Sequence, residues 1–551
     1  MKLNNYALHR LDSRIKNELL LFVLGLTILL SSCASVEKHN NQVTKLHPAK
    51  DLHQDIDHVY EQLQKNHPHL YQFTSKAVLD FKFDSLKKAI DSPMNSHDFY
   101  EQLSQVTKHV RQGHMSLSPP GLRLNRKERK ALRDTKFDIN NLDFEYVDDK
   151  LFISNARKGD SVLINAEVLE VDGQKAQSLL DKYTKLIASD GYNTTFHNRV
   201  TGYRFLGYYA KDKGRFDSIS LKLKQADSTF VKMYKRVLKK DTSSVKKDSL
   251  KQDSLKAVKK AVVKLTKAER KAKRQKLKAQ RKYNRDYGYI SSRDEYTRNL
   301  NFVGRDSTVA LLKIRGFSNG NYKRFYDASF KTIDSLKAET LIIDLRNNFG
   351  GRLNEIAYLY GYLTDENYTF INPSEITRRY PILKSSMANT TPTGIKILIG
   401  LFSPVLATVD ILKTSKKDGK LYYKFKSGKE QAPKDLNFKG NIYVLINGNS
   451  FSASSLLSTN IQGSNKAVFV GEETGGAYNG TVAGMYKSYE LPHTKVRARI
   501  GLAHIDALYK TEPDGYGVKP DIEIRPTYED RLNGNDPELE WVLQDLDQQS
   551  K

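Results

Sequence analysis

The sequence predicts an α/β protein whose C-terminal half is built on a largely parallel sheet. Four short apolar runs are typical of buried strands: residues 309–314, 341–345, 441–446 and 467–471. Amphipathic stretches with helical spacing lie between them, such as residues 325–338 and 452–462. Alternation of strands and helices favours parallel strands covered by helices.

The first half of the chain has a different pattern. Residues 49–112 have the spacing of helices: the first ends before Pro68, and a second begins at Ser96 as N-cap and stops at Gly113. Residues 138–188 alternate between polar and apolar side chains, which is typical of strands. Residues 365–438 lack clear periodicity and are interpreted as an insertion.

These patterns divide the chain into seven segments. We predict an export signal (1–33), a tether (34–47), a helical region (48–125), a β-rich module (138–233), a Lys-rich insert (234–286), a catalytic domain (300–530) and a tail (531–551).

The beginning of the chain indicates export and lipid attachment. Residues 19–30 form an apolar run preceded by basic residues, as in a signal peptide. The run leads into Leu30-Ser31-Ser32-Cys33, which resembles a bacterial lipobox. We therefore expect Cys33 to carry lipid and the body to lie on the periplasmic side of a bacterial membrane, with the outer membrane favoured. An uncleaved signal anchor is the alternative. Since Cys33 is the one cysteine, no disulfide is expected.

The net charge of +27 is concentrated in one segment. Residues 235–285 hold 21 basic and four acidic residues and so carry +17 of it. The run lacks interleaved aromatic residues, so base stacking is not supported and no nucleic-acid partner is expected. The structural interpretation of this basic segment is a solvated helix or helical hairpin, or a partly disordered segment, without a binding role. Contact with anionic lipid is the functional one.

Ser452 is the strongest candidate nucleophile. It falls in the first turn of a predicted helix that follows a strand, where the N–H of Ala453 has no partner within the helix. Such an N–H can stabilise an oxyanion. Gly350 and Gly351, after the strand at 341–345, could present a second N–H. Read alone, the serine could simply cap the helix.

Four ordered motifs change this interpretation. They stand as DLRNNFGG (344–351), SFSAS (450–454), GEETGG (471–476) and GVKPD (517–521). Together they resemble the motifs of the C-terminal processing (tail-specific) serine peptidases. The resemblance covers residues 300–526. It implies a β-α-β spiral like that of Clp protease and crotonase, Ser452 as nucleophile, and oxyanion donors among Gly350, Gly351 and Ala453. Residues 166–174 resemble part of a PDZ module, although a plain β-hairpin remains open.

The residue that could act as general base differs from the one used in the best-known branch of that family. A lysine is expected near Ala477, yet residues 467–486 contain none. The tricorn-core-like branch uses a histidine from a Gly-His segment, which here is Gly113-His114. A carboxylate near the closing motif would orient it, with Asp514 as first candidate and Glu512 as second. His493 and His504 are rival histidines.

The resemblance therefore implies a serine endopeptidase that acts on peptides or protein tails in the cell envelope without a cofactor. No cluster with metal-ligand spacing stands out. Two alternatives stay open. One is a non-catalytic ligand-binding member of the same fold, because Phe349, Ser455 and Met115 differ from the usual residues. The other is an anionic-polymer-binding protein that uses the basic insert.

Overall fold

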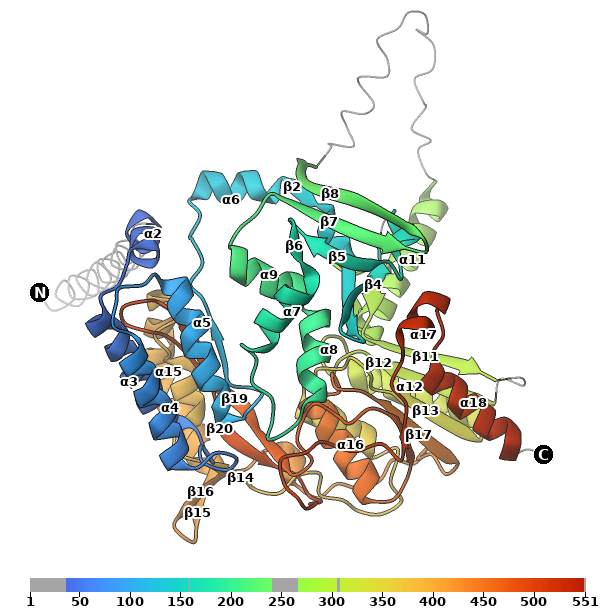
Figure 1. The fold of residues 1–551 in the computed structure, drawn as a ribbon. Helices are drawn as coiled ribbons and strands as arrows, with labels where there is room; N and C mark the ends of the chain where they lie inside the picture. The colour runs from blue at the N-terminus through green and yellow to red at the C-terminus, as the bar shows by residue number, and fades with distance from the viewer. Residues whose placement is uncertain (1–35, 158, 240–265, 305–307, 550–551) are drawn as a thin grey trace, which may run out of the picture.

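The computed structural model describes residues 36–157, 159–239, 266–304 and 308–549. The lipobox and the centre of the basic insert lie outside these residues. Figure 1 shows an N-terminal group of helices, a β-rich unit and a C-terminal α/β unit arranged around a common centre.

The central sheet of the C-terminal unit has six strands in the order β11-β12-β13-β17-β18-β21. They span Arg298–Val303, Val309–Ile314, Thr340–Asp344, Asn441–Ile446, Val468–Gly471 and Ile522–Glu523. All neighbours are parallel except β11 and β12. This confirms the predicted parallel-rich sheet.

Helices cover both faces of this sheet. On one face lie α12, α13 and α16, which span Tyr322–Ser335, Leu353–Tyr360 and Ala453–Gly463 and enclose the largest apolar core. On the other face Val542 of α18 (Pro537–Gln549) packs against Ile342 and Tyr443. Helices therefore pack on both faces of the sheet, and its parallel strands all end at the same edge.

A second sheet joins the N-terminal helices to the catalytic half. Its order is β1-β20-β14-β16-β15, with β19 beside β20. The strands span Ser116–Ser118, Arg497–Asp506, Ser374–Ile376, Lys420–Tyr423, Thr414–Lys417 and Gly480–Glu490. Helices α3, α4 and α5 (Ala49–Asn66, Lys76–Ala89 and Ser96–Thr107) pack on β19 and β20 through one apolar core. The segment after α5 is thus held against the catalytic half.

The β-rich unit is a seven-stranded antiparallel sheet. Strands β2 to β8 span Thr135–Phe137, Leu142–Val147, Lys150–Ala156, Glu167–Val171, Gln174–Lys175, Ser218–Gln225 and Ser228–Leu238. Helices α7, α8 and α9 accompany them (Ala176–Thr184, Thr195–Tyr203 and Phe205–Lys213). The expected hairpin and following helix are β5, β6 and α7. Whether they bind peptides as a PDZ module does stays a prediction.

Two sequence-based boundaries need correction. Asn95, not Ser96, caps α5, because its side chain accepts hydrogen bonds from the backbone of His97 and Asp98. Residues 234–238 of the expected insert belong to β8, where they pair with β7 and β2. The described end of the insert is the exposed helix α11 (Lys267–Tyr287).

The insertion expected at 365–438 contains two helices and a hairpin. They are α14 (Pro381–Ser386), α15 (Thr393–Lys413) and β15–β16. Of the described helices, α15 alone is long and apolar enough to cross a bilayer by length and composition. The remaining α-helices in the described part of the chain are α2 (Val36–Thr44), α6 (Arg126–Arg133) and α17 (Tyr528–Asn533).

Candidate active site

Two loops meet where β13 and β17 end. Because these strands are parallel neighbours, the segments that follow them leave the sheet side by side. The Ser450 hydroxyl donates to Leu345 O at 2.9 Å, and the Phe451 N–H donates to Asn348 O at 3.0 Å. Asn449 also donates to the Asn347 side chain at 2.9 Å. The two sequence motifs therefore form one rigid unit under Ser452.

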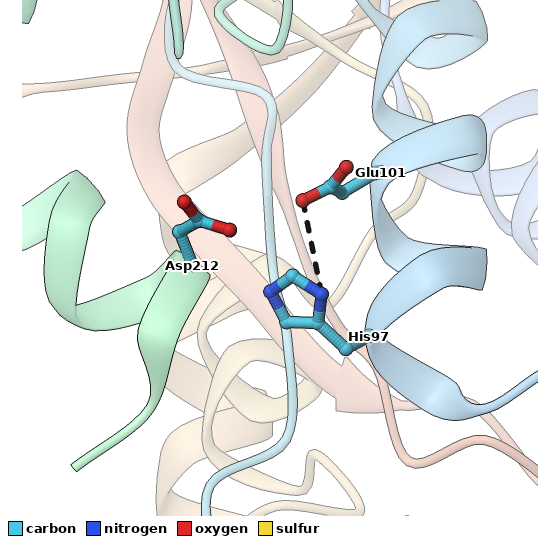
Figure 2. Close-up of side chains that lie close together, drawn as sticks. All are labelled: His97, Glu101 and Asp212. Atoms are coloured by element: carbon cyan, nitrogen blue, oxygen red, sulfur yellow. Dashed lines mark ion pairs between the residues drawn. The ribbon is translucent and has the colours of Figure 1, made fainter. Parts of the chain in front are cut away.

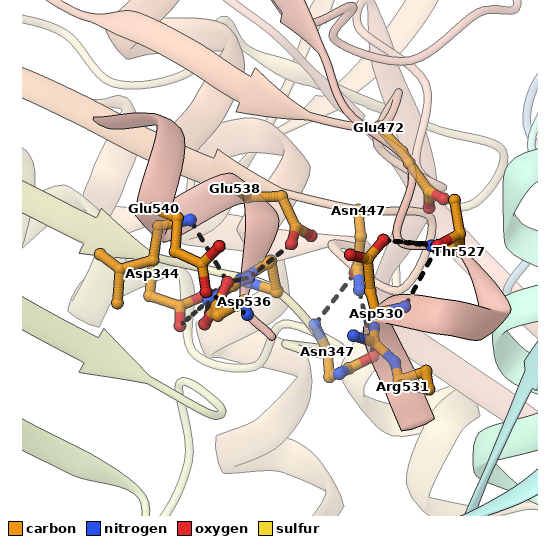
Figure 3. A network of polar contacts seen from close by, with 12 residues as sticks. Asp344, Asn347, Asn447, Glu472, Thr527, Asp530, Arg531, Asp536, Glu538 and Glu540 are labelled. Carbon is orange, nitrogen blue, oxygen red and sulfur yellow. Dashed lines mark hydrogen bonds and ion pairs between the residues drawn. The ribbon is translucent and has the colours of Figure 1, made fainter. Parts of the chain in front are cut away.

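A network of ion pairs holds the first of these loops from the outside (Figure 3). The Arg346 guanidinium contacts Asp344 at 3.0 Å and bridges to Asp536 at 2.5 Å and Glu538 at 3.1 Å. Arg346 and Lys313 hold the pKa of the Asp344 carboxyl well below its usual range, although burial opposes them. This acidic group therefore stays ionised and supports the loop.

Ser452 has an unusual backbone. Its φ is 61° and its ψ is −119°, a combination that costs a residue with a Cβ atom free energy. It stands just before α16 and turns the chain sharply from strand to helix. Its side chain makes no capping hydrogen bond, so the structure does not support the view that Ser452 is only a cap.

Gly350 makes room for this turn. A Cβ atom at Gly350 would lie 2.7 Å from the Ala453 nitrogen and 2.9 Å from the Ser452 Cβ. Its φ of 89° also favours glycine. The glycine after the strand is thus required by the close approach of the serine loop.

His114 lies beside Ser452. Its Nε2 is 2.9 Å from the Ser452 Oγ, although the two residues are 338 positions apart in the chain. Strand β1 brings it there by pairing with β20, with Ser116 opposite Arg499. The imidazole stacks on the Phe451 ring at a centroid distance of 4.7 Å.

The environment of His114 keeps its imidazole neutral. Burial, with a smaller contribution from the positive charge of Arg499, lowers its pKa to about 3. A neutral imidazole can accept a proton from a hydroxyl. Met115, which replaces the usual residue after this histidine, is buried in the core of the N-terminal helices and so anchors the segment.

Thr481 and Asp190 complete a chain of polar groups behind His114. The Nδ1 of His114 lies 3.1 Å from the Thr481 Oγ1. The Thr481 side chain also contributes to lowering the pKa of the buried Asp190 carboxylate, which accepts from Gly113 N at 2.6 Å. Burial raises the pKa of Asp190 to about 6, against these hydrogen bonds.

The structure does not bring Asp514 to the imidazole. Its carboxylate accepts from Gln72 at 2.9 Å and from its neighbour Gly515, and Glu512 accepts from the Asp514 backbone. The prediction placed the orienting carboxylate by distance in sequence from the closing motif. Thr481, on the strand after the GEETGG loop, takes the position next to Nδ1 instead.

The other residues considered as general base, two histidines and one lysine, contact residues other than Ser452. His493 contacts Gln54 and Asp51 of α3, and His504 stacks on His69 at 4.3 Å. Lys487, the first lysine after the GEETGG loop, donates to Gln62 at 2.6 Å. Among the described histidines these rivals therefore do not replace His114 at Ser452.

The backbone donors near Ser452 are not equivalent. The Gly350 N–H donates to the Asn348 side chain at 2.9 Å and is already used. Within the described residues, no hydrogen bond is recorded for the N–H groups of Gly351 and Ala453. Of the three predicted oxyanion donors, these two remain available.

A cleft of about 480 Å³ opens at Ser452. Strands of the second sheet line it together with the loops and helices that follow β13 and β17, and the lining includes Gly351, Leu456, Thr481, Ala483 and Tyr486. Its walls are mixed, with apolar side chains from β19 and polar groups at the serine. The cleft can hold an extended peptide segment with its carbonyl group near Ser452.

One described group of side chains could bring metal ligands together, away from this cleft. His97, Glu101 and Asp212 place ligand atoms within 4.8 Å of one another (Figure 2). The Lys182 ammonium already bridges the two carboxylates, at 2.6 Å from Glu101 and 2.7 Å from Asp212. Since a cation is built into the cluster, we assign no metal to it.

Comparison with known proteins agrees with this geometry. Residues 308–524, which contain the central sheet and Ser452, match the family described as peptidase family S41. Residues 308–524 are therefore similar to a peptidase family S41 domain. This similarity supports a serine peptidase. No curated protein sequence matches the chain.

Three solved structures align with most of this chain, and the two of mature CPAF share its fold. Mature CPAF is 15% identical, with a TM-score of 0.55, over 90% of this chain and 96% of that chain. Mature CPAF complexed with lactacystin gives 15% identity and a TM-score of 0.57 over 91% and 98%. The photosystem II D1 C-terminal processing protease is 11% identical, with a TM-score of 0.39, over 86% and 93%.

The two CPAF comparisons extend the shared fold beyond the S41 domain. They cover 90% and 91% of this chain, far more than residues 308–524 alone. At 15% identity they show the fold alone. The predicted fold class is therefore confirmed.

Proposed function

We propose that the chain is a serine endopeptidase of the cell envelope that cleaves peptides or protein tails through an acyl-enzyme on Ser452. The 2.9 Å hydrogen bond between Ser452 Oγ and His114 Nε2 is the observation that carries this proposal. A nucleophile within hydrogen-bond reach of a neutral base is the basic requirement for acyl transfer.

Proton transfer begins the reaction. His114 accepts the hydroxyl proton as the Ser452 oxygen attacks the scissile carbonyl carbon, and the carbonyl oxygen becomes an oxyanion. The N–H groups of Gly351 and Ala453 stabilise that charge. The imidazolium then donates its proton to the leaving amine as the peptide C–N bond breaks. Water hydrolyses the acyl-enzyme by the same steps, with His114 again as base.

Thr481 and Asp190 act as positioning residues in this scheme. The His114 Nδ1–H donates to the Thr481 Oγ1, and the Thr481 hydroxyl donates to Asp190. This fixes the tautomer in which Nε2 is the acceptor. An ionised Asp190 also stabilises the imidazolium through the intervening hydroxyl. The arrangement differs from a direct histidine–carboxylate pair because one hydroxyl stands between them.

An active-site probe tests the proposal. A fluorophosphonate should add to the protein once, at Ser452, and intact mass and peptide mapping would report the site. Ser452→Ala should abolish the adduct and the cleavage of casein. Ser454→Ala is the matched control, since its hydroxyl is buried on the same helix without a hydrogen-bond partner. Equal labelling of the Ser452→Ala variant would contradict the proposal, and casein left intact by the parent enzyme would favour the non-catalytic alternative.

The proposed location depends on residues 19–33. An apolar run followed by Leu-Ser-Ser-Cys supports export and lipid attachment at Cys33. Metabolic labelling with an alkyne fatty acid should mark the parent chain and leave Cys33→Ser unlabelled. Equal labelling of both would show that the lipid, if any, is elsewhere.

A further inference from the structure

Helix α15 is apolar and exposed at the same time. Its mean hydropathy over an 18-residue window is 2.0, and only 6% of that window is buried. Asp410 is the one buried residue of the helix. The thirteen residues from Ile397 to Val409 carry no charge. A helix of this composition is normally enclosed in a core or in lipid, and this one has no core around it.

The exposed side chains form a continuous stripe. Leu398, Leu401, Phe402 and Val405 are 56%, 69%, 61% and 61% exposed. Their spacing of three, four and seven residues places them on one side of the helix. Leu412 continues the stripe and is 75% exposed. Bulky apolar side chains gathered in this way mark an interaction surface.

Both ends of α15 are fixed to the same body. Just before the helix, the Thr390 hydroxyl donates to Ser488 O of β19 at 2.8 Å. At its end, Lys413 O accepts from the Lys424 backbone at 2.8 Å. Asp410 also accepts backbone hydrogen bonds at the start of α14. A helix tied at both ends to one folded unit cannot cross a bilayer, but it can lie along one.

The charges around the stripe fit an anionic surface. Lys396 stands in the first turn, Lys413 in the last, and Lys416 and Lys417 are exposed on the following strand. Lysines beside an apolar helical face are typical of helices that lie in the interface of anionic bilayers. A symmetric dimer through the same stripe would bring these like charges together, which disfavours a second copy as the occupant.

The beginning of the described chain points to the same side of the molecule. His39 of α2 and Thr390, three residues before α15, line one surface depression, and Figure 1 shows α2 and α15 on one side. Cys33 precedes Val36 by three residues, a reach of about 10 Å. A lipid on Cys33 would therefore hold the α15 side near the bilayer.

We propose that α15 lies flat in the surface of an anionic lipid bilayer, with Leu398, Leu401, Phe402 and Val405 toward the acyl chains. The stripe replaces water contact by lipid contact, and the flanking lysines contact lipid phosphates. Ile382 of α14 and Lys413 also line the cleft at Ser452. The docked protein thus holds its cleft close to the membrane surface. The docking itself does not depend on catalysis.

A fluorescent label at the stripe tests the docking. Leu401→Cys in the full chain would be labelled with an environment-sensitive nitrobenzoxadiazole dye, and the protein reconstituted into phosphatidylcholine vesicles with or without phosphatidylglycerol. We expect a blue shift and quenching by nitroxide-labelled lipid, both stronger with phosphatidylglycerol. Val231→Cys is the matched control, because Val231 is exposed on β8 of the β-rich unit. The parent chain, treated with the same dye, shows how much label attaches to Cys33.

The outcomes separate the possible occupants. Lipid quenching at residue 401 and none at residue 231 supports the proposal. No quenching at residue 401 overturns it, and a blue shift that follows protein concentration without lipid assigns the stripe to a second copy. Leu398→Glu combined with Leu401→Glu provides an independent arm, with unchanged fluorophosphonate labelling as the folding control. With Cys33→Ser also present, so that no lipid on residue 33 anchors the chain, it should lower vesicle binding of the unlabelled protein relative to Cys33→Ser alone, and unchanged binding would also overturn the proposal.

Discussion

The Nδ1 of His114 lies 3.1 Å from the hydroxyl of Thr481, and no carboxylate contacts the imidazole directly in the described structure. Asp190 is held between the two segments that supply these groups, because it accepts from Gly113 N, next to His114, and from Ala477 N, after the GEETGG loop. This relationship makes the position of the base depend on two segments that are far apart in the chain.

Thr481→Val should lower kcat by about 10- to 100-fold, the usual cost of removing a group that orients a functional imidazole. Valine keeps the shape but removes the acceptor for Nδ1–H and the donor to Asp190. KM should change little, because the hydroxyl acts through His114. Steady-state kinetics on a fluorogenic peptide would measure both. Thr481→Ser restores the hydroxyl and should recover most of kcat, whereas equal loss in both variants would indicate a packing role alone.

Activity should fall as the pH drops through about 6. Burial raises the pKa of Asp190 to about 6, so its carboxylate is ionised above that pH and protonated below it. Only the ionised form stabilises the imidazolium of the transition state. The pKa of His114 is lowered to about 3, so the free imidazole is neutral throughout this range.

Asp190→Asn provides the control for that pH dependence. The variant should be slower at every pH and should lose the inflection near 6 in kcat/KM. An inflection that persists unchanged in Asp190→Asn would assign it to another group and contradict the role given to Asp190.

The sequence predicted the parts of the site that lie in local motifs. Ser452 and Gly351 follow strands whose apolar runs are easily recognised, and parallel pairing necessarily brings the ends of β13 and β17 together. His114 was predicted from a resemblance, and the structure places it beside Ser452. The roles of these residues in catalysis stay predictions.

The residues behind His114 could not be predicted, because their contacts depend on tertiary packing and leave no local pattern in the sequence. Asp190 stands before Gly191 in a segment typical of a turn, and Thr481 is the second residue of β19. Their position at His114 results from packing among the N-terminal helices, the β-rich unit and β19. Asp514 was chosen for its place in sequence, and Gln72 holds it elsewhere. Similarly, the hydrophobic length of α15 was missed in a region without clear periodicity.

Gly113→Ala should reduce activity strongly. A Cβ atom at this position would lie 2.7 Å from the Phe451 ring, which stacks on His114, and 3.3 Å from Asp190. The ring or the His114 segment must move, and the hydrogen bond to Ser452 lengthens. Peptidase assays would show a fall in kcat. Gly207→Ala is the control, because the space around Gly207 in α9 is open. Equal activity of Gly113→Ala and the parent would show that the site tolerates this shift.

Ser452→Gly should stabilise the protein while it abolishes activity. The φ of 61° and ψ of −119° at Ser452 are unfavourable for a residue with a Cβ atom and accessible to glycine. Relief of this strain is worth on the order of 1–3 kcal/mol, partly offset by the greater freedom of glycine in the unfolded chain. We therefore expect a net gain of about 1 kcal/mol. Thermal unfolding would measure it against Ser452→Ala, which also lacks the hydroxyl but keeps the strain. A Tm for Ser452→Gly at or below that of Ser452→Ala would show that the turn stores no strain.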